Sequence, residues 1–193
     1  MRIGLLGGSF NPIHIGHLML ASYMQQYVGF DEVWLMLSPL NPLKVDTADL
    51  IPDIRRLQML DIAIGDAKGL VVNDIELSMP RPSYTINTLR YLSKKYQRHT
   101  FKLIIGSDNW KIFSQWKDSE EILDDYGVMV YPRPGYPLGT VYDDRVEIVK
   151  APVTDISSTF IRQGIARGRD MRYFLPVGVY DYIKTNNLYG YKA

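Results

Sequence analysis

A glycine turn between an apolar segment and a helix-like segment constrains this chain more than any other feature. Residues 3–6 are apolar, residues 7–12 read Gly-Gly-Ser-Phe-Asn-Pro, and a helical pattern begins near Gly16. A strand, a glycine turn and a helix N-terminus aim unpaired backbone N–H groups and the positive end of a helix dipole at one place. His14 and His17 lie three residues apart, so they share a helix face and add imidazole donors there. This arrangement predicts a nucleotide-phosphate site at the carboxyl end of the first strand.

The sequence excludes the commoner phosphate loops. No G-x-x-x-x-G-K-[ST] occurs in the chain, and no G-x-G-x-x-G follows the first strand. A zinc site on the two histidines is disfavoured, because the chain has three His and no Cys and its carboxylates show no ligand spacing. We therefore predict no protein-bound metal. The remaining alternative is an ordinary turn and amphipathic helix with incidental histidines.

Strand-like and helix-like segments alternate along the chain. Strands are predicted at residues 2–6, 32–37, 70–75, 100–105, 126–131 and 146–149, and helices at 16–27, 54–64, 83–96, 157–166 and 176–185, with a short helical stretch before Trp116. This order predicts an α/β fold, a doubly wound and mostly parallel sheet with helices on both faces. Ligands then bind at the carboxyl ends of the strands. Residues 38–52 and 132–144, rich in Pro and Gly, are predicted loops.

Composition indicates one domain over residues 1–193, with a small helical portion from about residue 151. The chain is 46% hydrophobic, which is enough for a substantial core. A net charge of +1 argues against nucleic-acid binding, although Arg55-Arg56 and residues 162–172 are local candidates for anion sites. No leader segment and no long apolar run is present, so we expect no membrane contact and a cytoplasmic location. A homo-oligomer is left open.

A second polar cluster lies near the C-terminus, at residues 156–162, which read Ile-Ser-Ser-Thr-Phe-Ile-Arg. Ser157 precedes an apolar periodic run, which is typical of a helix N-cap. The hydroxyl groups of Ser158 and Thr159, with Arg162 one turn later, also suit a polyphosphate. The two interpretations are compatible with each other.

Both clusters resemble motifs of one superfamily. Residues 8–17 are similar to the G-x-F-[DN]-P-x-H-x-G-H signature of the nucleotidylyltransferases, which join a nucleoside triphosphate to a phosphorylated partner and release pyrophosphate. Residues 156–162 resemble the I-S-S-T-x-I-R motif with which that superfamily grips the triphosphate. Asn11 stands where Asp is more frequent, and Ile13 where a second Pro is usual.

Segments between these motifs resemble the bacterial nicotinate-nucleotide adenylyltransferases. They are Glu76 and residues 82–89, 105–109, 116, 133–135 and 175–183, in the same order, so that the resemblance spans residues 1 to about 185. It implies transfer of the adenylyl group of ATP to nicotinic acid mononucleotide, giving deamido-NAD and pyrophosphate in NAD biosynthesis. Mg²⁺ would accompany ATP, and the two substrates would be the partners.

The resemblance also implies roles for individual residues. The residues implied for ATP binding are Gly8, Ser9, Phe10, His14, His17, Gly106, Asp108, Ser157, Ser158, Thr159 and Arg162, and among them His14, His17 and Arg162 are implied to be catalytic. The residues implied for mononucleotide binding are Lys44, Ser83, Tyr84, Thr85, Trp116 and Arg133. Within this set, the Thr85 backbone N–H would bind the nicotinate carboxylate and Trp116 would stack on the ring. Leu43 stands where the family usually has His.

Plainer interpretations of single positions stay open: Trp116 as core, Asp108 as a helix cap and Lys44 as a solvated charge. Two other functions also remain. One is a sibling transferase that uses nicotinamide mononucleotide or phosphopantetheine, which residues 82–89 and Trp116 disfavour. The other is a nucleotide-binding regulator without turnover, which the retained histidines, Lys44 and Arg162 disfavour.

Overall fold

The computed structural model describes residues 1–39, 49–139 and 143–192, which form a parallel α/β sheet structure. The strands are β1 (Arg2–Gly8), β2 (Glu32–Leu37), β3 (Leu70–Asn73), β4 (Thr100–Gly106), β5 (Val128–Tyr131) and β6 (Val146–Ile148). They form one six-stranded sheet in the order β3-β2-β1-β4-β5-β6, with parallel pairing throughout. The strand order reverses between β1 and β4, and in such sheets ligands bind beside that reversal. The predicted fold class is confirmed.

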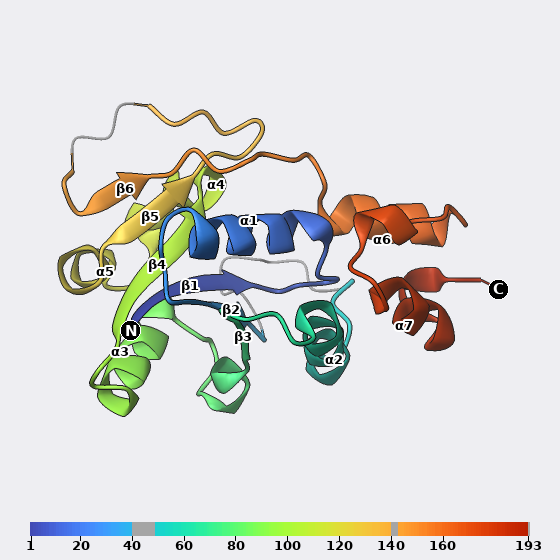
Figure 1. The fold of residues 1–193 in the computed structure, drawn as a ribbon, viewed down its shortest axis with the longest axis horizontal. Helices are drawn as coiled ribbons and strands as arrows, with labels where there is room; N and C mark the ends of the chain where they lie inside the picture. Colours follow the sequence, from blue (N-terminus) through green and yellow to red (C-terminus); the bar gives the residue numbers. More distant parts are fainter. Residues whose placement is uncertain (40–48, 140–142, 193) are drawn as a thin grey trace.

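Helices cover both faces of the sheet (Figure 1). They are α1 (Ile15–Gln26), α2 (Asp53–Ile64), α3 (Thr85–Lys95), α4 (Ser107–Trp110), α5 (Ser119–Asp125), α6 (Ser158–Ala166) and α7 (Val179–Thr185). Short 3-10 turns add η1 (Ile75–Ser78), η2 (Phe113–Gln115), η3 (Arg172–Phe174) and η4 (Leu188–Gly190).

The side chains of each strand point alternately to the two faces of the sheet and so divide the core into two layers. Leu6, Val33 and Leu35 pack with buried side chains of α1, α2, α6 and α7 in one layer. Leu5 and Trp34 point the other way and pack with side chains of α3 and α5. Successive side chains of a strand face opposite sides of a sheet, so strands covered on both faces are apolar throughout. The run Glu-Val-Trp-Leu-Met-Leu of β2 has this character, since its last five residues are buried.

Several predicted boundaries were wrong by a few residues. The third strand ends at Asn73, and the chain turns into η1 instead of continuing to Ile75. The last long helix starts at Val179 and not at Pro176, because Gly178 before it takes a φ of 85° that no helix contains. The helix α5 was not predicted, since a seven-residue element shows too little periodicity. The predicted site residue Lys44 and its neighbour Leu43 lie outside the described residues.

Within the described ranges, no helix is long and apolar enough to cross a membrane.

Candidate active site

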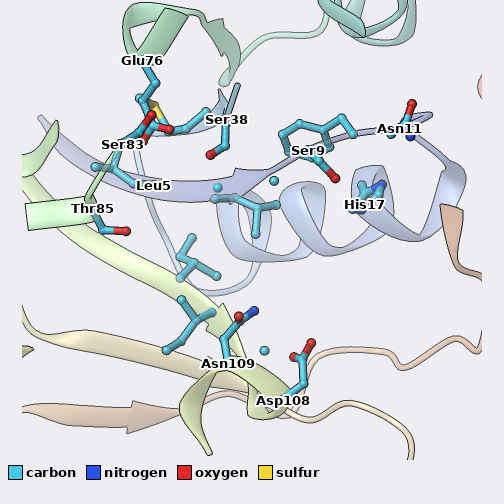
Figure 2. Close-up of a pocket in the computed structure, with 18 of the residues that line it drawn as sticks. Leu5, Ser9, Asn11, His17, Ser38, Glu76, Ser83, Thr85, Asp108 and Asn109 are labelled. Atoms are coloured by element: carbon cyan, nitrogen blue, oxygen red, sulfur yellow. The ribbon is translucent and has the colours of Figure 1, made fainter. Parts of the chain in front are cut away.

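One cavity of about 520 Å³ lies where β1 and β4 end, at the reversal of strand order. Figure 2 shows Ser9, Asn11 and His17 along one side and Asp108 and Asn109 on the opposite side. The figure also shows Glu76, Ser83 and Thr85 together at one end. Every site residue predicted from the sequence, apart from the undescribed Lys44, lines this cavity. The structure therefore brings together segments that are far apart in the sequence.

The two histidines begin α1 and contact each other. His14 is the N-cap residue, and its backbone N–H donates to Nδ1 of His17 at 3.2 Å. The two rings stack with centroids 3.7 Å apart. Since Nδ1 of His17 accepts a hydrogen bond, a neutral His17 ring carries its proton on Nε2. The local fold thus specifies which nitrogen of His17 is a donor.

Burial changes the charge state of His14. Desolvation, with a smaller contribution from the nearby Arg133 charge, lowers the pKa of His14 to about 4. At neutral pH the ring of His14 is therefore uncharged and has one N–H to donate. The sequence alone does not indicate that His14 is neutral, because its burial arises only in the folded chain.

The C-terminal cluster forms the start of α6, as predicted. Ser157 is the N-cap, and its Oγ accepts the N–H of Phe160 at 3.2 Å. Ser158 Oγ donates to the Pro12 carbonyl at 2.9 Å. Arg162 donates from Nη1 to the carbonyl of Asn11 at 3.0 Å. These contacts hold the second motif against the first.

Asn11 connects the cavity to two further segments, and sequence reasoning missed this role. Its Nδ2 donates to the Asp49 carbonyl at 2.8 Å, and its Oδ1 accepts the Tyr189 hydroxyl at 3.0 Å. Tyr189 is 178 residues away in the chain. The Asp49 carboxylate in turn lies 3.3 Å from Nη2 of Arg162. No local sequence signal reports contacts over such separations.

At the opposite side of the cavity, β4 ends in Gly106 beside two charged side chains. A Cβ on Gly106 would lie 2.3 Å from Oδ1 of Asp108 and 2.6 Å from Cδ of Arg133, so glycine permits their close approach. Nε of Arg133 is 3.7 Å from Oδ1 of Asp108. Ser107 Oγ accepts the backbone N–H of Arg133 at 2.8 Å. Arg133, predicted on the mononucleotide side, therefore lies beside a residue predicted to bind ATP.

The end of the cavity near α3 combines apolar walls with backbone donors. Thr85 is the first residue of α3, and Tyr84 precedes it in an extended conformation. Trp116 packs at a tilt on Phe113, with ring centroids 5.4 Å apart. Glu76 accepts the Thr88 hydroxyl at 3.0 Å, and burial raises the pKa of its carboxyl.

Buried polar atoms without a hydrogen-bond partner concentrate in the same cavity. Among the described residues, six buried side-chain polar atoms have no hydrogen-bond partner, and five of them belong to residues that line it. These five are His14 Nδ1, Ser83 Oγ, Asp108 Oδ1, Trp116 Nε1 and Arg162 Nε. Buried polar atoms are nearly always paired, so this concentration indicates a binding site for a polar ligand.

The donor set is suited to anions. In the described part of the chain, no group of three or more His, Asp or Glu side chains is arranged to hold a metal ion. The candidate anion site at Arg55-Arg56 was wrong for Arg56, which is fully buried and donates to backbone carbonyls and to Asp53.

Comparison with known proteins agrees with this geometry. Residues 5–164 match the family model described as cytidylyltransferase-like. A protein of Bacteroides fragilis (strain YCH46) named "Probable nicotinate-nucleotide adenylyltransferase" is 48% identical over 180 residues, which are 93% of this chain and 89% of that protein. A protein of the same name from Bacteroides thetaiotaomicron is 45% identical over 185 residues, covering 95% of this chain and 91% of that protein.

A solved structure supports the fold. Plasmodium falciparum nicotinic acid mononucleotide adenylyltransferase, complexed with NaAD, superposes with a TM-score of 0.81 at 20% sequence identity, covering 99% of this chain and 98% of that one. From the matched family model and these relatives, the chain belongs to the cytidylyltransferase-like family, in the group of the nicotinate-nucleotide adenylyltransferases.

Proposed function

We propose that this protein transfers the adenylyl group of ATP to nicotinic acid mononucleotide, with deamido-NAD and pyrophosphate as products. The observation that carries the proposal is that the two predicted phosphate motifs, Asp108, Thr85 and Trp116 line the same cavity. Relatives at 45% and 48% identity carry the name of this activity.

The chemistry requires positioning and positive charge more than a base. The phosphate of a mononucleotide is already an anion near neutral pH, so one of its oxygens attacks the α-phosphorus of ATP directly. The bond between the α-phosphorus and the α–β bridging oxygen breaks, and pyrophosphate leaves with that oxygen. Repulsion between two polyanions opposes the approach, and preorganised donors offset it.

We assign donors of the cavity to the α, β and γ phosphates of ATP. His17 donates from Nε2 to the α-phosphate, and the neutral His14 donates to α and β oxygens. Ser158, Thr159 and Arg162 hold the β and γ groups that become the leaving pyrophosphate. Arg162 keeps Nη1 on the Asn11 carbonyl and has its buried Nε available for this contact.

Mg²⁺ belongs to the substrate in this scheme. Mg²⁺ commonly binds through substrate phosphates and water with few protein ligands. That the ion arrives with ATP, without a site of its own on the protein, is part of the proposal. The ion would offset phosphate charge, while Asp108 would contact the adenylyl ribose. The cytoplasmic location stays a prediction.

An acceptor panel tests the proposal. Pyrophosphate release from Mg-ATP is measured with nicotinic acid mononucleotide, nicotinamide mononucleotide and phosphopantetheine. We expect the highest kcat/KM with nicotinic acid mononucleotide. A higher kcat/KM with another acceptor would show that this acceptor, and not nicotinic acid mononucleotide, is the substrate. If no acceptor gives pyrophosphate release, a nucleotide-binding regulator without turnover is favoured.

A further inference from the structure

The buried residue Arg56 lies beneath the loop that follows β1. Its side chain is fully buried, at the start of α2, and its guanidinium contacts the two loops that follow β1 and β2. Nη1 donates to the Ser9 carbonyl at 2.5 Å and to the Ser38 carbonyl at 2.9 Å. Nε donates to the Ile51 carbonyl at 3.2 Å.

A carboxylate holds the other end of this guanidinium. Nη2 of Arg56 contacts Oδ1 of Asp53 at 2.5 Å and donates to the Pro39 carbonyl at 3.4 Å. Arg81 binds the second oxygen of Asp53 at 2.9 Å. A guanidinium is a rigid planar fork, so carbonyls and a carboxylate bound to it are fixed relative to one another.

The contact with Ser9 orients the loop toward the cavity. In a trans peptide the carbonyl and the next N–H point in opposite directions, so a Ser9 carbonyl directed at Arg56 turns the Phe10 N–H away from it. Phe10 itself has a φ of 42°, a left-handed conformation that is unfavourable for a residue with a side chain. Surrounding contacts must therefore hold this conformation. Arg56 is the charged group that binds the carbonyl of the preceding residue.

We infer that Arg56 is a positioning residue, which presets the backbone N–H groups of residues 8–10 for the ATP phosphates without touching ATP. The inference rests on the proposed function only in taking ATP as the ligand. Arg56 differs from the residues proposed to contact phosphate, because its N–H donors face protein carbonyls and Asp53 and not the cavity.

Binding of ATP and of adenosine to the Arg56→Lys variant tests this inference. Lysine keeps the charge, but its single ammonium cannot reach the Ser9 carbonyl, the Ile51 carbonyl and Asp53 together. We expect the dissociation constant of ATP to rise about tenfold, the scale of one lost charge-assisted hydrogen bond. Adenosine, which lacks phosphates, should bind with an unchanged dissociation constant. Titration calorimetry measures both ligands on the same protein.

Arg55→Lys is the matched control. Arg55 is the neighbouring residue on α2, but it donates to the Tyr182 hydroxyl and to Oδ1 of Asn186 and does not line the cavity. We expect ATP and adenosine to bind this variant as they bind the unaltered protein. Unchanged ATP affinity in Arg56→Lys, or an equal loss for adenosine and ATP, would overturn the positioning role.

A second variant keeps the test decisive if Arg56→Lys does not fold. Asp53→Asn retains Arg56 and removes the charge that holds its Nη2, so we expect a smaller loss restricted to ATP. Arg81→Gln is measured beside it, because Asp53 also binds Arg81. If Arg81→Gln weakens ATP binding as much as Asp53→Asn does, the effect of Asp53→Asn does not act through Arg56. That result would contradict the positioning role of Arg56. These binding readouts need no acceptor, so they stand apart from the acceptor panel that tests the proposed function.

Discussion

His14 and His17 occupy one turn of the chain, but their environments give them different chemistry. His14 is only 5% exposed, whereas Nδ1 of His17 is held by a backbone N–H. The buried, neutral imidazole of His14 contributes a hydrogen-bond donor without charge. In His17, Nδ1 accepts a hydrogen bond, so the proton of the neutral ring is on Nε2.

The first prediction concerns stability at acid pH. The pKa of His14 is about 4 in the folded protein, below its ordinary value of 6.5, so unfolded chains bind more protons between these values. The stability that His14 provides is complete above pH 6.5 and is lost as the pH falls toward 4. The free energy of unfolding is measured with urea at about pH 7.5 and at about pH 4.5. Its decrease between these pH values should be about 2 kcal/mol smaller in His14→Asn than in the unaltered protein. The Arg133 charge acts on His14 and the His17 ring stacks on it, and both groups are retained in His14→Asn. Equal losses in the two proteins would contradict the buried neutral state.

The second prediction concerns turnover. His17→Ala removes a donor proposed to act on charge that develops in the transition state, so kcat should fall by about 10² or more while ATP affinity changes little. Steady-state kinetics and ATP titration measure the two quantities. His99→Ala is the control, because His99 is the remaining histidine and does not line the cavity. A nearly normal kcat in His17→Ala would exclude this role.

At the scale of elements, helix N-termini supply donors to both ends of the cavity. The first N–H groups of a helix have no partner within the helix. α6 begins at Ser158 and α3 at Thr85, and both residues line the cavity. The N-terminus of α3, beside Ser83 and Trp116, is therefore suited to an acceptor group such as a carboxylate.

The third prediction assigns the choice of acid over amide to this helix end. A nicotinate carboxylate offers only acceptors, whereas a carboxamide brings an NH₂ group or leaves a donor unpaired, so kcat/KM should favour the acid by about 10² or more. Thr85→Pro removes the N–H at the first helical position, where proline is tolerated, and Tyr84 already has the extended conformation that precedes proline. The preference should shrink in Thr85→Pro and persist in Thr85→Ala. If Thr85→Pro keeps the full preference for the acid, groups other than the Thr85 N–H are responsible for it.

The C-terminal segments complete the cavity. Arg162 reaches the Asn11 carbonyl across 151 positions of sequence, and Tyr189 reaches the Asn11 side chain across 178. Buried residues of α6 and α7 share a core layer with α1 and α2. Figure 1 shows α6 and α7 beside α2 at one end of the sheet. The loop after β1 and the C-terminal motif at residues 156–162 are thereby held as one unit.

The fourth prediction tests this unit through Arg162. Arg162→Ala should weaken ATP binding by about tenfold or more and also lower kcat, because the guanidinium is proposed to hold the β and γ phosphates before and during reaction. Arg162→Lys should recover only part of the loss, since an ammonium lacks the planar fork. Arg172→Ala is the control, because Arg172 is exposed and pairs with Asp170 away from the cavity. Unchanged ATP affinity in Arg162→Ala would refute the assignment.

The α/β class, the two motifs at residues 8–17 and 156–162 and the cap at Ser157 were predictable from the sequence, because they depend on periodicity and on neighbours a few residues apart. Tertiary structure decided what depends on burial and distant contacts: the neutral state of His14, the place of Arg133 beside Asp108, and the links of Asn11 to Tyr189 and Arg162. Arg56 shows the difference most clearly. Its sequence context, Arg55-Arg56, suggests a local anion site. Only the packing of α2 under two loops buries Arg56 and directs its guanidinium at backbone carbonyls. Desolvation and contacts between remote segments arise only when the chain is packed, so no local pattern encodes them.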